Sequence, residues 1–152
     1  MKDQLKKLSF ETVLQFGRLA MKVLKTNWIN VLGVFVIVYL YMMTLNHLYI
    51  PRYDVFQLFI SAGILVCLYG MMFWSLFVLS LIVLDLILFV RNQSNLKVKL
   101  LSEWLVISSP FIYWTVRHNE WIFLVGVGAF LITQLMREKV IKKALDTSNP
   151  LS

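Results

Sequence analysis

The sequence predicts an all-α membrane protein, a polytopic bundle of four transmembrane helices with an N-terminal amphipathic helix and an unusually long second helix. Of the 152 residues, 59% are hydrophobic and only 15% are charged, and the mean hydropathy is +0.74. A soluble domain of this size has too little interior to bury so much apolar surface. The charged residues also divide the chain into apolar runs near the length of about 20 residues that a membrane-spanning helix needs.

The first element, residues 1–26, is predicted to be an amphipathic cytoplasmic or interfacial helix. Its polar side chains recur every three or four positions and so share one stripe of a helix; they are Gln4, Lys7, Glu11, Gln15, Arg18, Lys22 and Lys25. Two interpretations stay open. The helix lies on the inner leaflet, where anionic lipids attract its lysines, or it packs on the inward end of the second span.

A four-helix transmembrane domain is predicted over 27–136, with spans at about 28–50, 55–90, 100–116 and 121–136, followed by a basic cytoplasmic tail over 137–152. The second run is long enough for one long helix, for a hairpin of two spans, or for a helix with a re-entrant part. A single crossing places 13 of the 15 Lys and Arg residues on the side of both termini, whereas two crossings divide them 7 against 8. Because basic residues concentrate on the cytoplasmic side, we expect one crossing, both termini in the cytoplasm, and a location in the cell or inner membrane.

Ionisable residues inside the spans are the candidate functional residues, because a carboxylate in a membrane is costly and usually faces protein or water. Asp85 and Glu103 both lie toward the predicted cytoplasmic side, with Asn30, Gln134 and Arg137 at similar depth. We favour an ion-pair or hydrogen-bond clasp, for instance between Asp85 and Arg137. The alternatives are a proton or cation site, and a Glu103 that simply lies among the lipid headgroups.

Two helix-packing seams are predicted from small residues that share a helix face and let helices approach closely. The first seam lies on the second run and consists of Gly63, Cys67, Gly70 and Trp74. The second lies on the fourth span and consists of Gly126, Ala129 and Thr133. Polar residues of the second run scatter around the helix and do not line a pore. In the third span, Ser108-Ser109-Pro110 predicts a kink.

Catalytic and metal-binding motifs are not recognisable in the sequence. It contains no GxSxG or Walker motif, so we expect no enzyme activity and no cofactor. The single cysteine, Cys67, excludes an intrachain disulfide and a CxxC pair. Two histidines and two acids on the predicted outer side lack the spacing of a metal site; they are His47, Asp54, His118 and Glu120. The basic segments alternate with apolar spans, which favours anionic inner-leaflet lipids over nucleic acid as their partner.

The first functional hypothesis is a non-enzymatic membrane protein that acts through helix–helix contacts, as an accessory, regulatory or immunity-type subunit or as a self-assembling oligomer. Its expected partners are the lipid bilayer and either a second copy or another membrane protein. The arrangement of four spans with both termini inside is similar to that of the immunity proteins against pore-forming colicins, a resemblance of topology that carries over no residue. The alternative is a small ion channel or proton-coupled transporter that uses Asp85 and Glu103. A lipid-modifying enzyme that uses Glu103 is the third hypothesis.

Overall fold

The computed structural model describes residues 17, 21–50, 52, 54–91 and 95–146, and this part of the chain is helical apart from short turns. Its elements are α2 (Asn27–Tyr49), α3 (Val55–Ile64), the π-helical turn η1 (Leu65–Tyr69), α4 (Met71–Arg91), α5 (Leu96–His118) and α6 (Trp121–Asp146). The predicted all-α fold class is confirmed over these residues. The helix predicted over 1–26 lies mostly outside them, although Met21–Lys25 is helical and leads into α2 through a turn at Thr26.

Within the described part of the chain, three helices are long and apolar enough to cross a membrane: Met21–Tyr49, Met71–Leu88 and Trp121–Lys143. They support a location in a membrane. Helix α5 is as long as α2, with 23 residues in each, but Lys97, Lys99 and Glu103 make its first half polar. Whether the span predicted over 100–116 crosses the membrane therefore depends on how α5 accommodates these charges.

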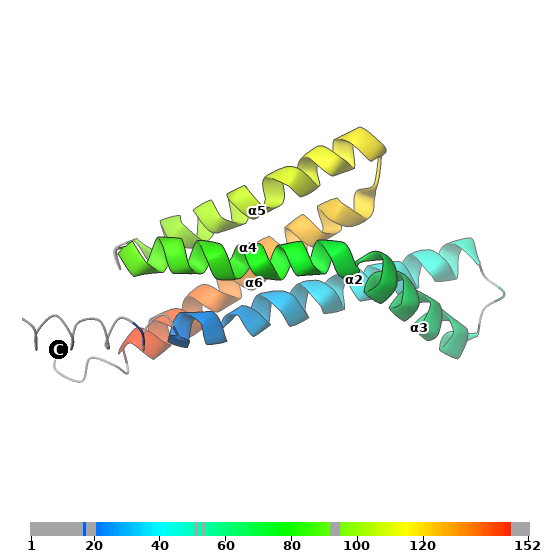
Figure 1. The fold of residues 1–152 in the computed structure, drawn as a ribbon. Coiled ribbons are helices and arrows are strands. Elements are labelled where there is room, and N and C mark those ends of the chain that lie inside the picture. The colour runs from blue at the N-terminus through cyan, green and yellow to red at the C-terminus, as the bar shows by residue number, and fades with distance from the viewer. Residues whose placement is uncertain (1–16, 18–20, 51, 53, 92–94, 147–152) are drawn as a thin grey trace, which may run out of the picture.

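The helices form a bundle in which α2 and α6 lie side by side and α5 returns along α6 (Figure 1). Asn119 ends α5 in a left-handed conformation with φ 57°, which asparagine tolerates better than most residues, and α6 begins two residues later. Helix α4 packs mainly on α5, whereas α3 packs on α2. Proline does not end α5, which continues through Pro110 to His118.

The run over 55–90 folds as α3, η1 and α4 and does not double back as a hairpin, since Figure 1 shows α4 continuing away from α3 after a bend. The helix begins at a capping box, in which the Asp54 carboxylate accepts a hydrogen bond from the Gln57 backbone N–H at 2.8 Å. At the bend, the Trp74 indole donates to the Val66 carbonyl at 3.2 Å. A Cβ atom on Gly70 would overlap this carbonyl, so glycine is required there. The unusually long second helix predicted over 55–90 is therefore divided by a π-helical turn, and such turns are one of the recognised causes of helix bends.

The predicted seam on α6 faces α2. Ala129 and Thr133 are buried, and a Cβ atom on Gly33 of α2 would overlap the Thr133 methyl group. Gly33 therefore allows the two helices to approach closely. Gly33 was not predictable from the small residues of α2 alone, because its role depends on the complementary Thr133 of another helix.

The predicted seam on the second run faces α2 only in part, through Gly63 and Trp74. A Cβ atom on Gly63 would lie 3.7 Å from the Tyr39 ring, and Trp74 packs on Phe35 with ring centroids 5.7 Å apart. The atoms nearest to a Cβ on Gly70 would belong to Val66 and Trp74 of the same run. Cys67 is exposed and does not contribute to packing within the bundle.

Candidate functional site

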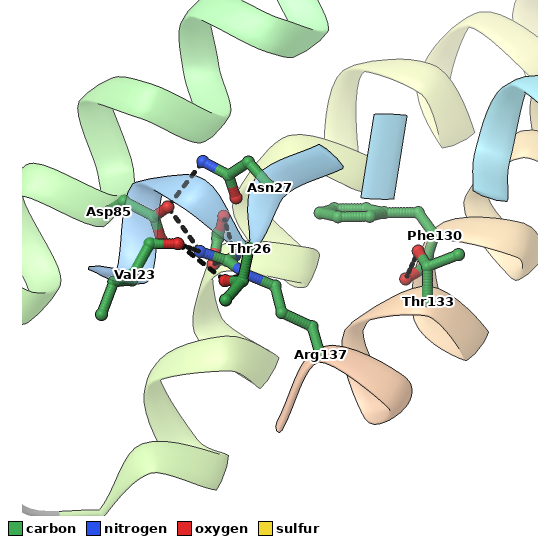
Figure 2. Close-up of polar contacts among 8 residues, drawn as sticks. Val23, Thr26, Asn27, Asp85, Phe130, Thr133 and Arg137 are labelled. Carbon is green, nitrogen blue, oxygen red and sulfur yellow. Dashed lines mark hydrogen bonds and ion pairs between the residues drawn. The ribbon is translucent and has the colours of Figure 1, made fainter. Parts of the chain in front are cut away.

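A buried ion cluster connects the helices at one end of the bundle, and Arg137 of α6 is its centre. One face of α6 points into the protein and carries residues spaced by four, three and four positions, as residues on one helix face are; they are Phe130, Gln134, Arg137 and Ile141. All four side chains are buried, and Arg137 is 0% exposed. Figure 2 shows its side chain extending from α6 toward α4 and the segment that precedes α2.

The guanidinium of Arg137 forms ion pairs with both candidate carboxylates. Its Nη2 lies 2.5 Å from Asp85 Oδ2, and its Nη1 lies 3.2 Å from Glu103 Oε2 and 3.3 Å from Oε1. Glu103 is 0% exposed, so its carboxylate does not lie at the surface among lipid headgroups. The ion cluster, defined as Arg137, Asp85 and Glu103, thus joins α4, α5 and α6.

The segment before α2 completes the coordination of Arg137. Its Nε donates to Thr26 Oγ1 at 2.8 Å, and its Nη2 donates to the Val23 carbonyl at 3.4 Å. The Thr26 hydroxyl itself donates to the Val23 carbonyl at 2.6 Å, and the Asn27 amide donates to Asp85 Oδ2 at 2.7 Å. Every guanidinium nitrogen therefore has an acceptor, as a buried arginine requires.

Val23 also packs into the same end of the bundle. It is buried with Leu100 and Ile141, and Leu88 of α4 packs against this group. The described end of the predicted amphipathic helix, Met21–Lys25, thus contacts the C-terminal part of the second run. The remainder of 1–26 lies outside the described residues.

Three partners of the ion cluster were not predicted from the sequence: Val23, Thr26 and Asn27. Thr26 and Asn27 were detectable in principle, because together with Asn30 they place polar side chains on one side of a helix at the start of an apolar span. The contribution of Val23 is a backbone carbonyl, for which no side-chain pattern exists.

A layer of buried amides lies next to the ion cluster. Asn30 follows Asn27 by one turn of α2, and Gln134 precedes Arg137 by one turn of the antiparallel α6, so both lie on the same side of the cluster. Their amide atoms make no hydrogen bond within the described residues, although Gln134 is near enough to Glu103 to interact with its charge. Ser108 Oγ and Asp85 Oδ1 are likewise buried without a hydrogen-bond partner there. The predicted polar residues are thus brought together at one end of the bundle.

The residues considered for a metal site do not form one. Among the described residues, no group of three or more His, Cys, Asp or Glu side chains is arranged to hold a metal ion. Asp54 caps α3, and His118 stacks on Trp114 with ring centroids 4.7 Å apart.

No protein-family model matches the chain, and no curated protein or solved structure matches it either.

Proposed function

We propose that this is a four-span, non-enzymatic integral membrane protein that acts through helix–helix contacts. In addition to the three candidate spans, α5 crosses the membrane, as predicted for 100–116. Its buried acid, Glu103, is paired with Arg137 inside the bundle, which removes the main obstacle to placing this helix in a membrane. Both termini then lie in the cytoplasm, on the side that carries most of the basic residues.

The observation that carries the proposal is the direction of the polar groups. The polar residues of the ion cluster and its neighbouring layer are buried, whereas large hydrophobic side chains of the spans are exposed on the outward faces. A partner within the membrane therefore meets mainly aliphatic side chains, whose association relies on close packing. Helix α4 is the most apolar of the three candidate spans, and its outward residues form the proposed contact face; they are Leu76, Leu79, Val83, Leu86 and Ile87.

Photo-crosslinking in native membranes tests this contact face against plain lipid exposure. A benzophenone amino acid replaces Leu79 on α4 or, as a matched control, Leu135 on α6, whose exposures are 58% and 57%. We expect protein adducts from position 79 and lipid adducts alone from position 135. An adduct of twice 17.8 kDa identifies a second copy, and another mass identifies a different membrane protein. Lipid adducts alone from both positions would contradict the proposal.

A second candidate function, a proton-coupled or cation-conducting protein, is favoured by the composition of the ion cluster. Two carboxylates face one guanidinium, and Asp85 Oδ1 and Asn30 Oδ1 are buried at the same end of the bundle with no hydrogen-bond partner among the described residues. Carboxylate and amide oxygens are the ligands that hard cations prefer, and an excess buried carboxylate is a natural proton acceptor.

Flux measurements in liposomes test the second candidate. The protein is reconstituted with an internal pH dye, and proton and Na⁺ flux are compared between the wild type and Asp85→Asn. We expect the substitution to abolish flux, since it removes the excess negative charge. Glu138→Gln is the control, because Glu138 pairs with the exposed Lys142 and does not belong to the ion cluster. Flux that persists in Asp85→Asn would remove this role from the cluster.

A further inference from the structure

The bundle contains an apolar cavity of about 210 Å³. It lies between α2, η1, α4, α5 and α6 and is lined entirely by apolar residues and glycine, among them Val38, Val66, Phe73, Phe111, Phe123 and Phe130. The T-shaped pair Phe77–Phe130, with ring centroids 5.0 Å apart, borders it. Cavities of about 150 Å³ with such a lining exclude water and bind benzene, so this one has room for an apolar ligand.

The cavity exists partly because Gly126 contributes no side chain to it. A Cβ atom at this position would lie 3.8 Å from Val38 Cγ2, which is an ordinary contact distance. A larger side chain would therefore extend into the space without a clash at its first atom. Interiors of helical bundles are normally filled to high density, so an unfilled, partly open space beside a glycine is suited to a guest molecule.

We propose that this cavity binds an acyl chain of a bilayer lipid. Helices that are themselves candidate spans form three of its walls, and in a membrane the abundant apolar molecules are lipid chains. The lining offers no hydrogen-bonding side chain apart from the Trp74 indole, which is already bonded to the Val66 carbonyl. A polar ligand would therefore lose its hydrogen bonds with water and gain none from the cavity wall.

A row of rings connects the cavity with the C-terminal end of α5, where a headgroup can bind. Phe73 lies against Trp114, with ring centroids 5.9 Å apart, and Trp114 stacks on His118 at 4.7 Å. Tryptophan favours the membrane interface. The neighbouring Arg117 is exposed and supplies a cation for the lipid phosphate. The row thus matches a lipid whose chain enters between the helices and whose headgroup stays at the α5–α6 turn.

The test uses phosphatidylcholine with a photoreactive diazirine in its acyl chain, incorporated into vesicles with the full-length protein. After illumination, mass spectrometry locates the adducts. We expect adducts on the lining residues Phe73, Phe111 and Phe123 in the wild type. Gly126→Leu fills the cavity and should reduce these adducts by roughly tenfold, because a filled pocket excludes its ligand.

Two further variants make the result decisive. Gly128→Leu is the matched control, since Gly128 is exposed and has nothing within 4 Å of its Cβ position; its cavity adducts should equal those of the wild type. Gly126→Ala adds a single methyl group and should give an intermediate decrease even if the leucine variant folds poorly. Adducts confined to outward-facing residues, or equal lining adducts in all four proteins, would overturn the proposal.

Discussion

Arg137 is the residue on which burial and charge act most strongly against each other. Taking three ionised groups out of water is costly, and their mutual attraction offsets this cost only with good geometry and complete hydrogen bonding. The guanidinium satisfies this condition through Thr26, Val23 and both carboxylates. Asp85 does so less completely, because its Oδ1 has no hydrogen-bond partner within the described residues. The members of the ion cluster should therefore differ in sensitivity to substitution.

We expect Arg137→Met to reduce the free energy of unfolding by about 3–5 kcal/mol, because it leaves two buried carboxylates without a counter-charge. Asp85→Asn should cost clearly less, since the remaining Arg137–Glu103 pair is electrically balanced and the asparagine oxygen can still accept from Nη2. The measurement is unfolding in mild detergent, followed by circular dichroism as a denaturing detergent is added.

Lys142→Met provides the control for this comparison. Lys142 is exposed and pairs with Glu138 within one turn of α6, and such surface pairs contribute about 0–1 kcal/mol. Equal losses for Asp85→Asn and Arg137→Met would show that charge balance does not determine the stability of the cluster.

At the scale of the elements, apolar runs and their charged boundaries were sufficient to predict most helices. The expected first span at 28–50 corresponds to α2, and the fourth at 121–136 begins with α6 at Trp121. Helix α6 continues to Asp146, through the segment predicted as a tail. Arg137 and Glu138, at the start of the predicted tail, are buried residues of this helix, although their charge predicted an exposed segment.

The bend at η1 was not predictable from hydrophobic periodicity. It depends on a hydrogen bond from a side chain to a backbone carbonyl, Trp74 to Val66, and on the absence of a side chain at Gly70. Periodicity describes which face a side chain occupies and contains no information on backbone bonding. For the same reason, the carboxylates and arginine of the candidate site were identified from sequence, whereas the Val23 carbonyl that accepts from Arg137 was not.

At the scale of the whole molecule, polar and apolar interactions are separated along the bundle. The ion cluster, which lies next to the amide layer, holds α4, α5 and α6 together at one end and joins them to the segment before α2. Beyond this layer, Val34 of α2 and Phe130 of α6 border the apolar cavity. One end is thus fixed by directional interactions, whereas the adjacent part is held by aromatic contacts that leave space between the helices.

The orientation in the membrane is a testable property of the entire chain, because it depends on how the basic residues are distributed between the two sides. Arg137 is buried. Without it, the proposed four-span topology still places twelve basic residues on the side of the termini, against Arg52 and Arg117 on the other side. The bias is large enough that we expect a single orientation. Single-cysteine variants in a Cys67→Ser background provide the measurement, with a membrane-impermeant maleimide applied to intact cells. Asn119→Cys, at the exposed α5–α6 turn, should be labelled at once, whereas Lys139→Cys, exposed near the end of α6, should react only after the cells are permeabilised. Because α6 connects the two positions, labelling of both in intact cells would show that it does not cross the membrane, and labelling of Lys139→Cys alone would reverse the orientation of all the spans.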